Sequence, residues 1–106
     1  MHQSSFINMK HFVQSNFKAL DTKKNLRVLD IGSLDVNGTY RTLFDPKFWT
    51  YEGLDMENGK NVDIVLDDPY DWKEIKNNAY DLVISGQALE HIEFPWKTFE
   101  NIERVL

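Results

Sequence analysis

A short apolar run at residues 26–31 constrains the fold of this chain more than any other stretch of its sequence. The run reads Leu-Arg-Val-Leu-Asp-Ile, and such a short series rich in branched apolar residues is typical of a buried strand. It leads directly into Gly32 and a turn of small and polar residues, after which a helix is expected to start at about Asn37. A strand, a tight loop and a helix in this order indicate an open α/β sheet, in which ligands bind beyond the carboxyl ends of the strands.

Helical and strand-like segments alternate along the rest of the chain, with connections of a few residues. Apolar residues at three- and four-residue steps predict an amphipathic helix over residues 5–20. Pro95 suits the first turn of a last helix, whose apolar stripe continues to Leu106. This alternation predicts the α/β class, with a parallel sheet of about four strands and helices on both faces. Further strands are expected at residues 48–54, 62–66 and 80–85, and short helices at residues 40–44 and around residues 72–75.

The same pattern indicates which bulky residues pack inside the domain. Gly53 lies inside the second strand, where a glycine indicates that another part of the backbone comes close. Five large side chains are interpreted as packing residues without a further function: Trp49, Tyr51, Trp96, Phe99 and Ile102.

Length and composition exclude several classes of protein. At 106 residues the chain is one domain, with an N-terminal helix and connection expected at residues 1–25 and a βαβ core at residues 26–106. It has no cysteine, so neither a disulfide nor a thiolate metal site can form. No apolar run approaches the roughly 20 residues of a membrane span, and the N-terminus lacks the pattern of a signal peptide. A cytoplasmic protein without membrane contact is therefore expected.

The charge distribution argues against nucleic acid as a partner. With 17 acidic and 12 basic residues the formal charge is −5, and the basic residues are scattered along the chain. Binding to the phosphates of nucleic acid depends on clustered Lys and Arg. The densest cluster here consists of Lys23, Lys24 and nearby Arg27, which we interpret as a solvated loop.

The loop after the first strand is the first candidate ligand site. Gly32 allows the main chain to turn sharply and leaves no Cβ in the way of a ligand, and Asp30 and Ser33 flank it. A helix that starts near Asn37 would aim unpaired N–H groups at the loop. Gly32 and Gly38 are six residues apart, which is not the spacing of the dinucleotide fingerprint. Local chemistry alone leaves two interpretations open, a ligand loop or an ordinary turn.

Acidic residues follow the second and third strands. A carboxylate at the position of Asp55 accepts hydrogen bonds from ribose hydroxyls in nucleotide-binding α/β folds. Met56 beside it could lie against an adenine ring or fill a gap in the core. Asp67 and Asp68 end the third strand, where a carboxylate could accept a hydrogen bond from an exocyclic amine. The alternatives are a solvated loop residue and, for Asp68, a helix cap ahead of Pro69.

A third group of polar residues follows the fourth strand. Gly86 again permits a close approach, and Ser85 and Gln87 stand on either side of it. His91 could act as a base near neutral pH or orient a substrate. The alternative is that Glu90 and His91 are solvated residues of a short helix. No second His stands at a metal-ligand spacing from His91, so no metal site is predicted.

Taken together, these four strand ends resemble the S-adenosylmethionine-dependent methyltransferases of the Rossmann-like class. Residues 28–33 (Val-Leu-Asp-Ile-Gly-Ser) are similar to the first motif of that family, and residues 51–55 (Tyr-Glu-Gly-Leu-Asp) to its second. Residues 62–67 look like the third motif and residues 81–91 like the fourth, whose Leu-Glu-His ending is the most specific part. The resemblance covers residues 26–106. It implies a Rossmann-like fold, S-adenosylmethionine as the cofactor and methyl transfer as the activity.

The resemblance also implies a role for each candidate residue. Asp30, Gly32 and Ser33 would hold the methionine part of the cofactor, Asp55 would bind the ribose hydroxyls, and Met56 would lie against adenine. At adenine, Asp67 would accept a hydrogen bond from the exocyclic amine and Asp68 would offer its backbone N–H. Ser85, Gly86 and Gln87 would line the floor beneath the sulfonium. His91 would stand nearer the substrate as the candidate catalytic base.

The sequence departs from the pattern of this family in two places. Leu34 stands where the first motif usually has a second glycine, and the chain ends at Leu106, before the family's fifth strand. We therefore expect a truncated sheet with an exposed edge, through which copies of the chain could form a homo-oligomer. The methyl acceptor is unidentified, and a small molecule is expected. The alternatives are a non-catalytic cofactor-binding or protein-interaction module, and another nucleotide-binding α/β enzyme.

Overall fold

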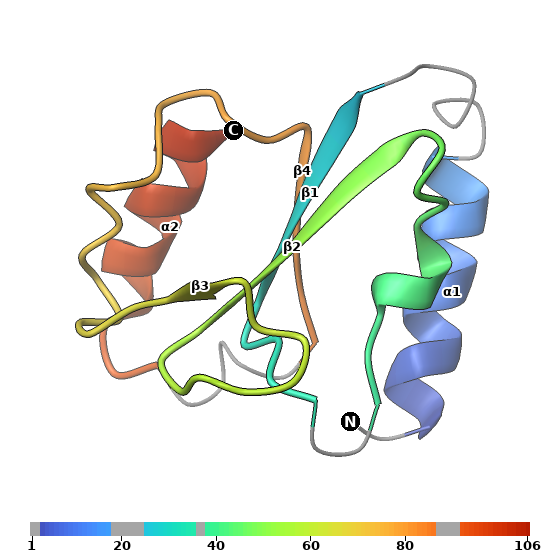
Figure 1. Cartoon of the computed structure of the whole chain (residues 1–106), viewed down its shortest axis with the longest axis horizontal. Coiled ribbons are helices and arrows are strands. Elements are labelled where there is room, and N and C mark those ends of the chain that lie inside the picture. The colour runs from blue at the N-terminus through green and yellow to red at the C-terminus, as the bar shows by residue number, and fades with distance from the viewer. Residues whose placement is uncertain (1–2, 18–24, 36–37, 87–91) are drawn as a thin grey trace.

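Four parallel strands form one sheet in the computed structural model, which describes residues 3–17, 25–35, 38–86 and 92–106 (Figure 1). The strands are β1 (Leu26–Ile31), β2 (Trp49–Asp55), β3 (Ile64–Val65) and β4 (Leu82–Ser85). They lie in the order β3-β2-β1-β4, and each neighbouring pair is parallel. The α/β class and the parallel sheet predicted from the sequence are confirmed.

The strand register brings the carboxyl ends of three strands to one edge of the sheet. Ile31 at the end of β1 lies opposite Leu54 of β2 and opposite Ser85 of β4. The chain order reverses at β1, because β2 and β3 lie on one side of it and β4 lies on the other. In open α/β sheets such a switch in strand order opens a crevice beyond the strand ends.

At their amino ends, away from this crevice, β1 and β4 are joined by two reciprocal hydrogen bonds. The Arg27 N–H donates to Oδ2 of Asp81 at 2.8 Å, and the Asp81 N–H donates to the Arg27 carbonyl oxygen at 2.8 Å. The Arg27 guanidinium also pairs with Glu52 of β2 and lies 4.8 Å from the centroid of the Tyr80 ring. These contacts join the amino ends of β1 and β4 and tie β1 to the middle of β2, which helps to keep the carboxyl ends of the three strands aligned.

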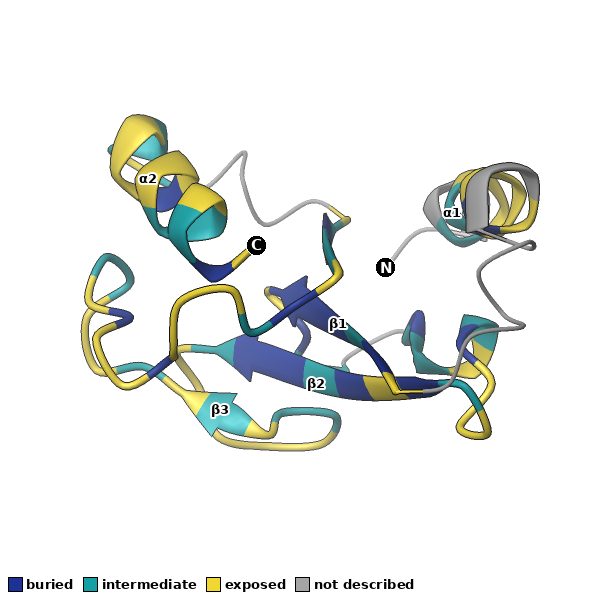
Figure 2. Cartoon of the chain, turned by 90° about the horizontal axis from the view of Figure 1, so that it is seen from above, coloured by how far each residue is buried: buried dark blue, intermediate teal, exposed yellow. Residues whose placement is uncertain are grey.

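Helix α1 (Gln3–Phe17) and helix α2 (Pro95–Val105) lie on opposite sides of the sheet, as the sequence predicts (Figure 1). None of the helices that the structure describes is long and apolar enough to cross a membrane. Successive strand residues point to opposite faces, so Val28 packs on the α1 side and Leu29 on the α2 side. Figure 2 shows β1 and β2 as the most buried elements of the chain.

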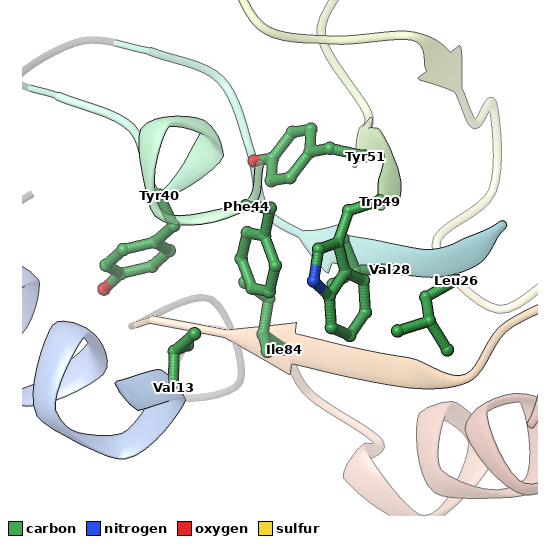
Figure 3. Close-up of a cluster of buried hydrophobic side chains, with 8 residues drawn as sticks. All are labelled: Val13, Leu26, Val28, Tyr40, Phe44, Trp49, Tyr51 and Ile84. Atoms are coloured by element: carbon green, nitrogen blue, oxygen red, sulfur yellow. The ribbon is translucent and has the colours of Figure 1, made fainter. Parts of the chain in front are cut away.

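Each face of the sheet carries its own hydrophobic core. The α1-side core is drawn in Figure 3 and consists of Val13, Leu26, Val28, Tyr40, Phe44, Trp49, Tyr51 and Ile84. The α2-side core consists of Leu29, Ile31, Leu54, Trp72, Ile75, Tyr80 and Val105. Trp49 and Tyr51 therefore pack in the core as predicted, but the Tyr51 hydroxyl group has a further role in the site described below.

The helix expected at residues 40–44 is shorter than predicted. It is a single 3-10 turn, η2 (Arg41–Leu43), and its expected start near Asn37 lies outside the described residues. Phe44 already has an extended backbone, with φ −114° and ψ 111°. Asp45 precedes a proline, a position that disfavours helical angles, so the turn cannot continue.

The helix expected around residues 72–75 does not form, and the structure has a series of turns there. Asp68 and Asp71 each accept a hydrogen bond from the N–H group two residues further on. Arg104 of α2 donates to the carbonyl oxygens of Trp72 and Ile75 at 2.7 Å each. Side-chain bonds to the local backbone compete with helical hydrogen bonding, so the segment stays in turns while Trp72 and Ile75 reach the core.

Strands β3 and β4 are both shorter than predicted. The strand expected at residues 62–66 is limited to Ile64–Val65, and the strand expected at residues 80–85 begins only at Leu82. The N–H of Tyr80 donates to the carbonyl oxygen of Val105 at 2.9 Å, so this end of the expected strand pairs with α2 instead of the sheet.

Two residues of α2 that were interpreted as core residues lie at the surface. Trp96 is 58% exposed and Phe99 is 55% exposed, which contradicts that prediction. The face of α2 toward the sheet is formed by Thr98, Ile102 and Val105, at the four- and three-residue steps of one helix face. Trp96 and Phe99 belong to a second apolar face, and only one face of a helix can contact the sheet.

Candidate functional site

A pocket of about 640 Å³ opens beyond the carboxyl ends of β1 and β2, and we call it the main pocket. Small-molecule sites in proteins commonly have volumes of roughly 300–1,000 Å³. The loops after the strands, the turns after β3 and the start of α2 enclose it. Its described lining residues are Asp30, Ile31, Gly32, Ser33, Leu34, Gly38, Thr39, Tyr40, Leu54, Asp55, Met56, Glu57, Leu66, Pro69, Tyr70, Trp72, Gly86, Ile92, Glu93 and Thr98.

Part of the candidate set from the sequence lines this pocket. The end of β1 and its loop supply three of these residues, the end of β2 supplies two, and the loop after β4 supplies one. They are Asp30, Gly32, Ser33, Asp55, Met56 and Gly86. The structure therefore brings together candidates from three separate strand ends.

The other candidates lie elsewhere. Asp67 and Asp68 are exposed and are not among the described lining residues. Leu66 and Pro69, on either side of this pair in the sequence, do line the pocket. Ser85 lines a second pocket, which is described further below. Gln87 and His91 lie outside the described residues.

Asp30 is the buried carboxyl group of the main pocket. It is only 3% exposed and accepts a hydrogen bond from the Tyr51 hydroxyl. Burial raises the pKa of Asp30 to about 7, although the Tyr51 hydrogen bond and the Arg41 guanidinium act in the opposite direction. The charge on this carboxyl group therefore changes near neutral pH, a property that is common at functional sites.

Asn61 connects the Asp30–Tyr51 pair to the loop after β1. Its side-chain amide donates to the Tyr51 hydroxyl at 3.0 Å and to the Ser33 carbonyl oxygen at 2.9 Å. Nε of Arg41 in turn donates to Oδ1 of Asn61 at 2.7 Å. Side chains from separate segments thus hold both the buried carboxyl group and the loop beside it.

Two glycines let the backbone come close around the pocket. Gly32 has a φ of 72°, in the left-handed region that glycine adopts without strain. A Cβ atom on Gly53 would lie 2.0 Å from the Asn61 carbonyl oxygen and 2.4 Å from Oγ of Ser33. The close approach predicted at Gly53 is therefore confirmed.

Backbone N–H groups hold Asp55 in place. Its Oδ2 accepts from the Leu34 N–H at 3.0 Å, and its Oδ1 accepts from the N–H groups of Met56 at 2.7 Å and Glu57 at 3.2 Å. An ionised carboxylate has about four lone-pair positions, so one remains for a ligand. The bond to Leu34 also joins the loop after β1 to the loop after β2.

The lining of the main pocket is acidic. Asp30, Asp55, Glu57 and Glu93 contribute carboxyl groups, and the described part of the lining contains no Lys, Arg or His. A cleft lined by charges of one sign concentrates their field, so the pocket favours a ligand that carries positive charge. Among the described residues, no three His, Asp or Glu side chains are grouped so that they could hold a metal ion.

Two buried hydroxyl groups in the lining have no hydrogen-bond partner within the described part of the chain. They are Oγ of Ser33 and Oγ1 of Thr98, in residues that are 4% and 1% exposed. Burying a hydroxyl group without a partner is costly. Both groups are therefore available to polar atoms of a bound ligand.

Several residues of the site were not predicted from the sequence. Tyr70 and Thr98 reach the pocket because the turns after β3 and the start of α2 fold back over the strand ends, and no local pattern signals this. Tyr51 did have a usable signal. Gly53 pairs with Asp30 and has no side chain, so the Tyr51 side chain on the same face of β2 can extend to Asp30.

Comparison with known proteins gives this pocket a context. Residues 29–106 match the model of a family described as methyltransferase domain. The crystal structure of a candidate S-adenosyl-L-methionine-dependent methyltransferase from Methanococcus maripaludis is similar in fold, with a TM-score of 0.67 and 18% sequence identity. The alignment covers 98% of this chain and 53% of that protein, so the chain spans about half of its length. No curated protein sequence matches the chain.

Proposed function

Because this chain belongs to the methyltransferase domain family, we propose that its main pocket binds S-adenosylmethionine and that the protein transfers methyl groups from this cofactor to an acceptor. The observation that carries the proposal is the acidic lining of the main pocket at the switch in strand order. S-adenosylmethionine has a sulfonium and an ammonium group, and both positive charges favour surrounding carboxylates.

The residues of the main pocket fit this cofactor in other respects as well. A volume of about 640 Å³ accommodates a molecule of nucleoside size. The partnerless hydroxyl groups of Ser33 and Thr98 offer hydrogen bonds to its polar atoms. The positive φ of Gly32 turns the chain so that the loop after β1 can follow the ligand closely.

We assign the cofactor contacts by extending the motif resemblance to the observed lining. Gly32, Ser33 and Asp30 would hold the methionine part. Asp55 would bind the ribose, and its remaining lone pair would accept from one of the two hydroxyls, because its other positions are bonded to backbone N–H groups. Met56 is 49% exposed and would offer an apolar, polarisable surface to the adenine ring.

Four further assignments stay predictions. Asp67 and Asp68 are proposed to reach adenine from the end of β3, where both residues are exposed. Gln87 is proposed beneath the sulfonium. His91 is proposed on the substrate side, where a neutral imidazole can accept a proton.

When bound, S-adenosylmethionine supplies an activated methyl group to the acceptor. The contribution of this chain would be to bind the cofactor, orient it and exclude water around it. We propose a small molecule as the acceptor. The expected cytoplasmic location and the association of copies through an edge strand, β3 or β4, stay predictions.

Calorimetry with S-adenosylmethionine and with NAD tests the proposal most directly. We expect the chain to bind S-adenosylmethionine in preference to NAD, and the substitution Asp55→Ala to weaken this binding about 10- to 100-fold, which corresponds to about 1.4–2.7 kcal/mol. Glu74→Ala is the matched control, because Glu74 is an exposed carboxylate outside the described lining of the pocket.

The outcomes separate the proposal from its alternatives. Preferential NAD binding would indicate another nucleotide-binding α/β enzyme, and binding of neither ligand would indicate an interaction module. Equal binding by Asp55→Ala and the unmodified chain would contradict the assignment of Asp55. Circular dichroism of each variant shows whether a lost affinity reflects a lost fold.

A further inference from the structure

A second, smaller pocket lies between α1 and the end of β4, and we call it the side pocket. Its volume is about 450 Å³. Tyr40 and Gly86 line both this pocket and the main pocket. A molecule in the side pocket would therefore adjoin a ligand in the main pocket at these two residues.

The contact between Tyr40 and Gly86 defines the boundary of the two pockets. A Cβ atom on Gly86 would lie 2.4 Å from the Tyr40 hydroxyl oxygen, so only glycine leaves room for this tyrosine. Tyr40 is 4% exposed, and its ring stacks on Phe6 of α1 with a centroid distance of 6.5 Å. Figure 3 shows its hydroxyl end pointing away from Phe44 and the rest of the α1-side core. These contacts fix the position of Tyr40, which lines both pockets where they adjoin.

The side pocket differs from the main pocket in its chemistry. Helix α1 contributes the polar Asn8 beside Met9 and Phe12. Strand β4 contributes Val83 and Ile84. No residue of its described lining is Asp, Glu, Lys, Arg or His. A charged molecule would lose hydration there without gaining an ionic partner, so the pocket favours an uncharged molecule.

One polar group inside the side pocket points to a ligand with a hydrogen-bonding group. Oγ of Ser85 is shielded from solvent and has no hydrogen-bond partner among the described residues. Ser85 stands directly before Gly86 and so lies next to the shared boundary. A hydroxyl group on a ligand could satisfy Ser85 and would then stand at the end of the pocket nearest the main pocket.

We propose that the side pocket binds the methyl acceptor, and that this acceptor is an uncharged molecule with a hydroxyl group, such as a phenol. The inference rests on the proposed function. In the transfer, the acceptor oxygen forms a bond to the methyl carbon while the bond from that carbon to sulfur breaks. The electron pair of the broken bond stays on sulfur, and the proton of the acceptor hydroxyl passes to the base proposed above.

Three simple molecules probe the pocket without any turnover. We would titrate 4-methylphenol (uncharged), 4-hydroxybenzoate (anionic) and tyramine (cationic) into the isotopically labelled chain and follow the backbone amide signals. The expected result is a saturable shift at Met9, Val83 and Ser85 with 4-methylphenol, and binding about tenfold weaker or more for both charged analogues.

Matched variants test the site itself. Phe12→Glu places a carboxylate in the lining and is expected to weaken 4-methylphenol binding at least about tenfold. Ile7→Glu is its control, because Ile7 is on the same helix, has 44% exposure against 46% for Phe12, and is outside the described lining. Ser85→Ala gives a second test that leaves α1 unchanged, with an expected loss of about three- to tenfold.

Separate titration with S-adenosylmethionine distinguishes the two proposals. Cofactor binding without saturable 4-methylphenol shifts at the side pocket would overturn the acceptor site alone. Equal binding of the anionic probe, or equal effects of Phe12→Glu and Ile7→Glu, would overturn it as well. Failure of S-adenosylmethionine to bind would overturn the proposed function, whatever 4-methylphenol does, and the acceptor role with it.

Discussion

The main pocket and the side pocket share two residues but are built in different ways. The main pocket is formed largely by loops that leave the ends of parallel strands, and side-chain and backbone hydrogen bonds join these loops to one another. The side pocket is formed by a helix packed against the end of a strand, and its described lining carries no charged side chain. The shape of the main pocket therefore depends on hydrogen bonds and charge, and the shape of the side pocket depends on hydrophobic packing.

This difference implies that the two pockets can be changed separately. Carboxyl groups line only the main pocket within the described residues, so substitutions that remove charge should act on its ligand and leave the side pocket intact. Substitutions that alter the close contacts between strand-end loops should deform the main pocket first. The three predictions below test this separation, beginning with the largest effect.

The largest effect is expected from Gly53→Ala. The new Cβ would lie 2.0 Å from the Asn61 carbonyl oxygen, a backbone atom that cannot move without displacing its loop. Overpacking of this kind costs about 1–3 kcal/mol, and a clash with the Asn61 backbone as well as with the buried Ser33 side chain places this case near the upper end. Urea denaturation should show a loss of about 3 kcal/mol in the free energy of unfolding.

Gly59→Ala is the control for this prediction. Its Cβ would lie 2.6 Å from Cδ1 of Leu34, the end of a flexible side chain, and the expected cost is less than about 1 kcal/mol. Similar losses for both glycine variants would contradict the idea that Gly53 holds the loops of the main pocket together.

A smaller effect, which depends on pH, is expected from Asp30→Asn. Because the pKa of Asp30 is about 7 in the folded chain and about 3.9 in an unfolded one, the folded state holds its proton more tightly. Stability from this group therefore falls as pH rises from about 4 to about 7, and Asn removes that loss. Between pH 5 and pH 8, the free energy of unfolding of the variant should gain about 2–3 kcal/mol relative to the unmodified chain.

Binding measurements on the same variant address the comparison of the pockets. The affinity for S-adenosylmethionine should rise with pH through about 7 in the unmodified chain, since the ionised Asp30 attracts a positive ligand. This rise should be reduced in Asp30→Asn, while binding of 4-methylphenol should stay the same. Glu74→Gln provides the control for a general change in net charge. A parallel change in 4-methylphenol binding would show that the pockets are not independent.

The smallest effect is expected from Glu57→Gln and Glu93→Gln. Both residues are exposed at the rim of the main pocket, where solvent and salt screen their charge. Each substitution should weaken binding of S-adenosylmethionine by about two- to fivefold at low ionic strength, and the difference should shrink as salt is added. A salt-independent loss would instead indicate a direct hydrogen bond to the ligand.

The sequence was sufficient to predict the sheet because its signals are local. The apolar run at residues 26–31 coincides with β1, because a strand that is buried on both faces consists largely of consecutive apolar residues and ends where polar residues begin. The alternation of helices and strands then implies parallel pairing. Parallel pairing in turn aligns the strand ends, which is why Asp30 and Asp55 were predicted close to one another.

The errors in the fold arise where distant residues decide the local structure. The turns around Trp72 depend on Arg104, which lies 32 residues further along the chain and donates a hydrogen bond to the Trp72 carbonyl oxygen. In α2, apolar residues occupy two faces, and the sequence of the helix alone does not show that the face with Thr98 meets the sheet. Trp96 was assigned to the core for this reason.

The same limit applies to the candidate site. Residues at strand ends, such as Gly32 and Asp55, were found because their position follows from the topology. Asn61 and Thr98 were not, since their part in the site depends on how loops and α2 fold back over the sheet. The sequence thus predicts the pocket residues at the strand ends better than the residues of the loops and of α2 that cover them.

The reciprocal hydrogen bonds between Arg27 and Asp81 have a consequence for the synthesis of the protein. These residues are separated by 54 positions, and their bonds align β4 with β1. Because synthesis proceeds from the N-terminus at about 5–20 residues per second, β1 leaves the ribosome several seconds before β4 can pair with it. During that interval the nascent chain exposes an unpaired edge of its central strand, and the wall between the two pockets is completed only after residue 86 has emerged.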